Sequence, residues 1–61
     1  MFSMHATVRI LPDVPIWHGH TGEIVDINPD ADDGNYYGVS FFDIREPHTV
    51  YFSEEELEIT E

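Results

Sequence analysis

The sequence predicts an all-β fold, one small barrel of five short strands in a chain of 61 residues. Short apolar runs alternate with period two, as expected of strands that bury one face. Proline, glycine, asparagine and aspartate gather between these runs and mark turns. No segment of eight or more residues repeats its apolar side chains with the helical period of 3.6 residues. Residues 1–61 are therefore expected to form a single domain, with the barrel core in 6–60.

The first half of the chain predicts two strands joined by a long loop. The first strand is expected at 6–11, where Val8 and Ile10 share one face. Prolines then end the ladder, because proline cannot donate a backbone hydrogen bond, and the segment 12–22 is expected to be a long ordered loop. The second strand is expected at 23–27. Its apolar residues break strict alternation, which indicates a bulge or a strong twist.

The second half predicts two more strands. Turn-forming residues fill 28–35, and the strongest strand pattern follows at 36–42. Gly38 inside this pattern indicates close approach by a neighbouring segment. The segment 43–48 is expected to turn the chain into a fourth strand at 49–52. The side chains expected to face the core from these two strands are Tyr37, Val39, Phe41, Val50 and Phe52.

The C-terminal segment predicts a helical turn followed by a fifth strand. Ser53 and Glu56 have the spacing of a capping box, in which the two residues satisfy each other's backbone N–H groups. The acids after Ser53 are favourable at the positive end of a helical turn. Leu57 and Ile59 are then expected to return to the core as a short last strand, with Glu58 outside.

The order of these motifs, TVRI…HGHTGEIVDI…YYGVSFF…VYFSEEELEI, resembles the SH3-like small barrels of bacteria and organelles. Gly19 and Gly22, followed by Ile24 and Ile27, look like the glycine-centred KOW signature. Similar layouts occur in the small ferredoxin-docking component of photosystem I, in the variable chain of ferredoxin–thioredoxin reductase and in the CarS antirepressor. The resemblance covers 6–60 and implies a five-stranded barrel with a long first loop and a short helical turn before the last strand. It implies little about function, because such folds host many unrelated activities.

The net charge of the chain limits the classes of partner that it can bind. Thirteen acids against two arginines, with no lysine, give a formal net charge of −11. Such a surface repels nucleic acids and anionic membranes, since both are bound through lysine and arginine. Basic protein surfaces are favoured partners, although acidity that serves solubility alone is an equally good interpretation. The chain has no cysteine, no signal peptide pattern and no apolar run of about 18 residues, so we expect a cytoplasmic protein.

These features predict a non-enzymatic acidic module that binds a basic protein surface. The likeness to CarS implies a more specific form, an antirepressor or inhibitor whose carboxylates occupy the places of phosphates on a DNA-binding protein. The alternative is a structural accessory subunit of a larger enzyme or photosynthetic complex. The protein is expected to be a monomer or a weak homodimer. The residues predicted to contact the partner are Asp30, Asp32, Asp33, Asp43, Glu46, Glu54, Glu55, Glu56, Glu58, Trp17, Tyr36 and Tyr51.

The three aromatic candidates carry different expectations. Tyr36 and Tyr51 have the opposite parity to their core neighbours, so both are expected on the surface. Tyrosine and tryptophan dominate the energetics of protein interfaces, which makes exposed aromatic residues candidate contacts. Trp17 allows two interpretations: it closes one end of the barrel, or it contacts a partner.

No catalytic residue, cofactor or metal site is predicted. The chain lacks cysteine and lysine, and a barrel this small is expected to lack a pocket of the usual ~300 Å³ or more. The segment 30–35 resembles the start of a calcium loop, but Phe41 occupies the twelfth position, where the EF-hand needs glutamate, so a solvated turn is expected. The chain has four histidines, and we expect them to be surface residues rather than ligands of a metal site. They are His5, His18, His20 and His48.

Overall fold

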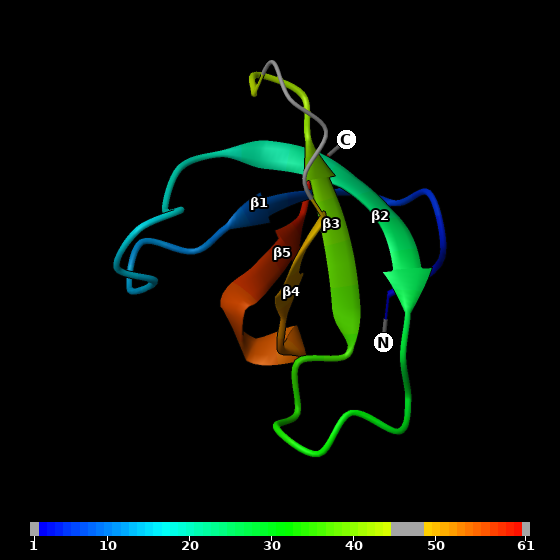
Figure 1. Ribbon diagram of the computed structural model, residues 1–61. Coiled ribbons are helices and arrows are strands. Elements are labelled where there is room, and N and C mark those ends of the chain that lie inside the picture. The colour runs from blue at the N-terminus through cyan, green and yellow to red at the C-terminus, as the bar shows by residue number, and fades with distance from the viewer. Residues whose placement is uncertain (1, 45–48, 61) are drawn as a thin grey trace.

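The computed structural model describes residues 2–44 and 49–60, and it confirms the all-β prediction (Figure 1). Within these residues, five antiparallel strands form one sheet in the order β4-β3-β2-β1-β5. A single 3-10 helical turn precedes the last strand, as predicted. The elements are β1 (Thr7–Ile10), β2 (Thr21–Ile27), β3 (Tyr37–Phe41), β4 (Thr49–Phe52), η1 (Glu54–Glu56) and β5 (Leu57–Ile59).

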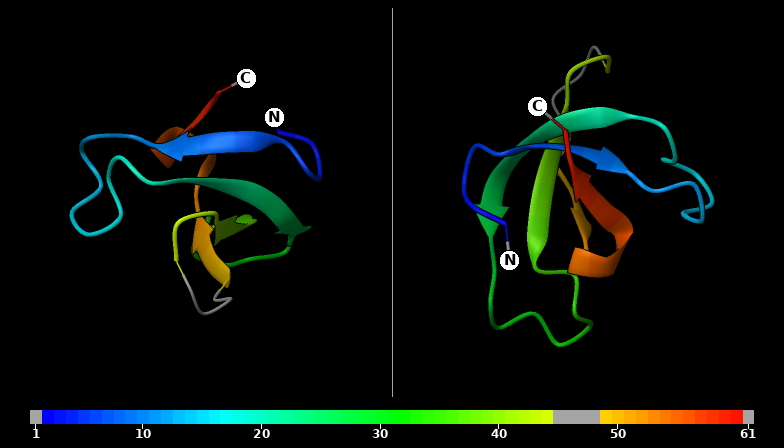
Figure 2. Two further views of the ribbon diagram at one scale, coloured as in Figure 1. Left: turned by 90° about the horizontal axis from the view of Figure 1, so that it is seen from above. Right: turned by 180° about the vertical axis from the view of Figure 1, so that it is seen from behind.

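The sheet curls around its apolar face. In Figures 1 and 2 the longest strand, β2, bends across the molecule and carries the chain from one side of the barrel to the other. The predicted bulge lies in this strand. Ile24 pairs with Val39, and Asp26 pairs with the adjacent residue of β3, which leaves Val25 without a partner in the ladder. A bulge increases local twist, so it accounts for part of the bend.

The core follows the predicted alternation, with one error. Ile59 was expected inside and is 48% exposed, because β5 is an edge strand of three residues and only Leu57 reaches the core. Val14 is a core residue that the strand pattern could not predict, since it lies in the first loop. The buried apolar side chains are Val8, Ile10, Val14, Ile24, Tyr37, Val39, Phe41, Phe52 and Leu57.

The long first loop is present and spans residues 11–20, because β2 begins two residues earlier than predicted. Gly19 has a φ of +84°, a left-handed conformation that glycine adopts without steric strain. Its N–H donates to the carbonyl of Ile10 at 3.1 Å, which folds the loop back onto the end of β1. Trp17 half-buries its ring against Phe41, with the ring centroids 5.0 Å apart and the planes at 14°.

The capping box predicted at η1 is also present. The backbone N–H of Ser53 donates to the carboxylate of Glu56 at 2.9 Å, and the Ser53 hydroxyl donates to the same carboxylate at 3.2 Å. No helix in the described part of the chain is long and apolar enough to cross a membrane. Of the predicted turn at 43–48, only the first two residues lie among those that the structure describes.

Candidate functional site

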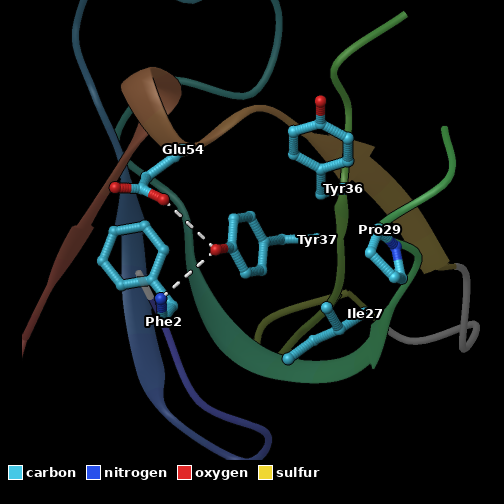
Figure 3. Close-up of a pocket in the computed structure, with 6 residues that line it drawn as sticks. All are labelled: Phe2, Ile27, Pro29, Tyr36, Tyr37 and Glu54. Atoms are coloured by element: carbon cyan, nitrogen blue, oxygen red, sulfur yellow. Dashed lines mark hydrogen bonds between the residues drawn. The ribbon is translucent and has the colours of Figure 1, made fainter. Parts of the chain in front are cut away.

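A cleft of about 300 Å³ opens at one end of the barrel, between the loop that joins β2 to β3 and the turn η1 (Figure 3). The expectation that so small a barrel has no room for such a pocket was therefore wrong. The core side chains fill the barrel interior, but Phe2 and the connection 28–36 extend walls beyond it. The residues that line the cleft are Phe2, Ile27, Pro29, Tyr36, Tyr37 and Glu54.

Tyr37 is the centre of this cleft. Its ring is buried and meets the ring of Phe2 edge-on, with centroids 5.3 Å apart. Its hydroxyl donates to Oε1 of Glu54 at 3.2 Å and accepts the backbone N–H of Phe2 at 3.3 Å. Figure 3 shows Phe2 and Glu54 on one side of this ring and Ile27 and Pro29 on the other. A core residue of β3 thus ties the N-terminal segment to η1 and fixes the Glu54 carboxylate in the cleft.

The loop between β2 and β3 forms the opposite wall and is held by its own backbone. The N–H of Asn28 donates to the carbonyl of Tyr36 at 2.7 Å, which closes the loop at its base. The N–H of Asn35 donates to Oδ1 of Asp33 at 3.1 Å, the side-chain-to-backbone bond typical of an aspartate turn. Gly34 has a φ of +80°. These contacts confirm turn chemistry at 28–35.

The structure brings five of the predicted partner-binding acids to this end of the barrel. Three of them lie in the loop whose residues Pro29 and Tyr36 form one wall of the cleft, and two lie on η1 at the other wall. All five are exposed. We call the loop 28–36 together with η1 the cleft end, and its exposed acids are Asp30, Asp32, Asp33, Glu54 and Glu55.

Three of the four other predicted acids are engaged in contacts within the fold. Oδ2 of Asp43 lies 2.8 Å from Nδ1 of His20, after β3. Glu58 on β5 accepts hydrogen bonds from the guanidinium of Arg9 on the neighbouring strand. Glu56 is half-buried, and its carboxylate caps the helical turn that it belongs to. The prediction for Glu46 lies outside the described residues.

The three aromatic candidates lie in three different places. Tyr36 is 37% exposed and lines the cleft. Trp17 packs on Phe41 and takes no part in the cleft lining. Tyr51 is 42% exposed and donates its hydroxyl to Oδ2 of Asp26 at 2.5 Å. This hydrogen bond, with some desolvation and the negative charge of the carboxylate, raises the pKa of Tyr51.

Four lining residues escaped the sequence prediction of the site. The patterns indicate only turn and strand roles for Pro29 and Ile27, and only a core role for Tyr37. These three residues flank an acidic turn, and Tyr37 lies next to Tyr36 in the sequence, so this arrangement could have indicated a site at the turn. Phe2 belongs to no strand pattern, and nothing in the sequence alone connects it with η1.

The histidines are separated. Nδ1 of His5 lies 2.6 Å from Oε2 of Glu23, apart from the pair of His20 with Asp43. His18 is exposed in the first loop. Within residues 2–44 and 49–60, no three or more histidine, aspartate or glutamate side chains are placed to hold a metal ion. His48 lies outside the described residues.

The cleft combines aromatic and aliphatic walls with one fixed carboxylate, which is the composition of a binding site for a partly apolar, positively charged group. Further exposed acids lie in the loop that supplies Pro29 and Tyr36 and on η1. A comparison with protein-family models and with curated proteins finds no match to this chain, so the likeness to SH3-like barrels stays an expectation from the sequence.

Proposed function

We propose that this protein is a non-enzymatic binding module whose cleft end engages a basic surface of another protein. One observation carries the proposal: the loop and the helical turn that supply the walls of an apolar cleft, with the exposed ring of Tyr36 in its lining, also carry exposed acids. An apolar, aromatic centre with a charged rim is the usual composition of a protein interface.

The charge distribution supports a basic partner. The formal net charge is −11, and the guanidinium of Arg9 is already bound to Glu58 on the far edge of the sheet from β4. Arg9, the one arginine among the described residues, is therefore engaged outside the cleft end. Complementary charge of this kind accelerates association and loses strength as salt is added.

A DNA-binding protein is the most specific partner that we propose. Its nucleic-acid surface is basic and is built to receive a row of phosphates. The carboxylates of the β2–β3 loop and of η1 would then replace phosphates, and the module would act as an antirepressor or inhibitor. The lack of cysteine favours a reducing compartment such as the cytoplasm as the place of this encounter.

The test is capture from the native lysate at low salt, elution by a salt gradient and identification by mass spectrometry. We expect a basic protein that is released between about 100 and 400 mM salt, where surface electrostatics are screened. Capture should be lost when Asp30, Asp32 and Asp33 are replaced by asparagine. The matched control neutralises three acids away from the cleft, Asp13, Glu23 and Asp43, and should keep the partner. Equal loss in both variants would contradict the proposal.

A second candidate is an accessory subunit of a larger complex, and it depends on a different surface. Ile16 is 76% exposed and Phe42 is 60% exposed, although both are large apolar side chains. Burial of such side chains against a large partner would give a contact that resists salt. Under this candidate, serine at Ile16 and Phe42 should abolish binding, whereas neutralising the loop acids should change it little.

A further inference from the structure

We infer that the cleft receives the side chain of an arginine from the basic partner. This inference rests on the proposed function and deepens it, because it names the group that enters the site. The geometry of the cleft matches the two parts of an arginine side chain, which are an apolar stem and a flat cationic head.

The walls suit the stem and the flat face of the head. Ile27, Pro29 and Phe2 offer aliphatic and aromatic surface, and long basic side chains bury their methylene groups along such surface. Tyr36 presents an exposed aromatic ring beside them. A guanidinium stacks on an aromatic face through a cation–π contact, which is stronger where water is excluded.

The polar side of the cleft suits the charged head. The Tyr37 hydroxyl donates to Oε1 of Glu54 and so holds the carboxylate in place (Figure 3). A carboxylate has about four lone-pair positions, so it can accept guanidinium N–H groups in addition to the donors that it already has. Hydrogen bonds between a guanidinium and a carboxylate are short, strong and often paired.

Charge decides among the possible occupants. Asp30, Asp32 and Asp33 lie in the loop that forms one wall, so a phosphate or carboxylate ligand is repelled. A neutral apolar side chain would fit the apolar walls but would gain nothing from the negative charge of this end of the barrel. A lysine supplies charge, but its ammonium is more strongly hydrated and has no flat face to stack on Tyr36. Arginine has both the flat face that stacks on Tyr36 and the positive charge that the acidic side of the cleft attracts.

The test uses three short peptides, acetylated and amidated, that differ only in carrying several arginine, lysine or citrulline residues between glycine and serine. Citrulline has the shape of arginine without its charge. Each peptide is titrated into the full chain at about 50 mM salt, where charge pairs are weakly screened, and followed by amide NMR spectra. We expect the arginine peptide to shift the amides of Ile27, Tyr36, Tyr37 and Glu54, and to bind about threefold or more tightly than the lysine peptide.

Two substitutions on the same helical turn give a matched pair. Glu54→Gln and Glu55→Gln each remove one negative charge from η1, but only Glu54 lines the cleft. We expect Glu54→Gln to weaken the arginine peptide about five- to tenfold, and Glu55→Gln to weaken it less than about twofold. Tyr36→Leu should weaken it about threefold or more, while Tyr36→Phe keeps the ring and the affinity.

The outcomes separate this inference from the proposed function. Equal binding of the arginine and lysine peptides, equal effects of Glu54→Gln and Glu55→Gln, or amide shifts outside the cleft would overturn the arginine site and leave an acidic surface that binds basic partners. Weak, salt-independent binding of all three peptides would overturn both. Tight binding of the citrulline peptide would show that charge is not what the cleft recognises, and would also overturn the site.

Discussion

Tyr51 on β4 reaches across the neighbouring strand β3 and donates its hydroxyl to Asp26 on β2. The residue between them is Gly38 of β3, which pairs with Asp26 on one side and with Tyr51 on the other. A Cβ atom at Gly38 would lie 3.0 Å from Cε2 of the Tyr51 ring, so the tyrosine packs directly over the glycine. The close approach that the sequence predicted at Gly38 is therefore made by a side chain, and it connects three strands on the outer face of the sheet.

The Tyr51–Asp26 bond predicts a shifted tyrosine titration. Because the hydrogen bond to Asp26 raises the pKa of Tyr51, this tyrosine should ionise above the ordinary value of about 10 in an absorbance titration at alkaline pH. Asp26→Asn should lower that pKa towards the ordinary value of about 10. Tyr51→Phe should remove this step from the titration curve. An unchanged titration curve in Asp26→Asn would contradict the bond.

The same bond predicts the direction of a pH effect on stability. The pKa of Tyr51 is higher in the folded protein than in the unfolded chain, so the folded state keeps the phenolic proton to higher pH. The contribution of the bond to the free energy of unfolding is thus complete below about pH 10, the pKa of an unfolded tyrosine, and is lost as pH rises through the folded pKa. Urea unfolding of wild type and Tyr51→Phe should therefore differ at neutral pH and converge at strongly alkaline pH.

The two buried glycines of the sheet should differ in their tolerance to alanine. A Cβ at Gly22 would collide with the carbonyl oxygen of Ser40, which is backbone and cannot move aside. A Cβ at Gly38 would meet Cγ2 of Thr49 at 2.7 Å and the Tyr51 ring, which are side chains. We expect Gly22→Ala to destabilise by about 2–4 kcal/mol and Gly38→Ala by about 1–2 kcal/mol in chemical denaturation. The reverse ranking would contradict the described packing.

Trp17 is predicted to close the barrel. Its ring stacks on Phe41, a buried residue of β3, and this contact favours the first of the two interpretations that the sequence left open. Trp17→Ala should lower the free energy of unfolding by about 2–3 kcal/mol, somewhat less than for a fully buried tryptophan. The neighbouring Ile16→Ala is the control, because Ile16 is exposed, and should change stability by less than about 0.5 kcal/mol. Equal losses of stability at both positions would contradict the conclusion that Trp17 closes the barrel.

Salt should stabilise the fold. With a net charge of −11, repulsion among carboxylates disfavours the compact state, and salt screens that repulsion. Raising sodium chloride from about 20 to 300 mM should increase the thermal midpoint by about 2–5 °C. The triple replacement of Asp30, Asp32 and Asp33 by asparagine should reduce this increase. A midpoint that falls with salt would mean that ion pairs such as Arg9–Glu58 outweigh the repulsion.

Local patterns in the sequence predicted most of the fold because they have local causes. The broken alternation at Ile24 and Val25 indicated the bulge, and the spacing of Ser53 and Glu56 indicated the capped turn. The error at Ile59 has a non-local cause. Whether the last residue of an edge strand is covered depends on what lies beyond it in space, and the period of the strand carries no such information.

The cleft was less predictable because it is made by contacts distant in sequence. The bond from Phe2 to Tyr37 spans 35 residues, and that from Tyr37 to Glu54 spans 17. The composition indicated that acids contact the partner, but it could not distinguish which of the acids do so. Only the folded chain separates the exposed acids of the cleft end from Asp43, Glu56 and Glu58, which are engaged in a histidine pair, a helix cap and an arginine pair.

The most direct test of the central claim is the affinity of the arginine peptide for two triple variants of equal charge. One replaces Asp30, Asp32 and Asp33 at the cleft end, and the other replaces Asp13, Glu23 and Asp43 elsewhere on the barrel, in both cases with the corresponding amides. Measured by titration calorimetry at about 50 mM salt, the cleft-end variant should bind about tenfold more weakly than wild type, and the control variant less than about threefold more weakly. Equal weakening of the two variants would mean that the peptide responds to net charge alone and that the cleft end is not the binding surface.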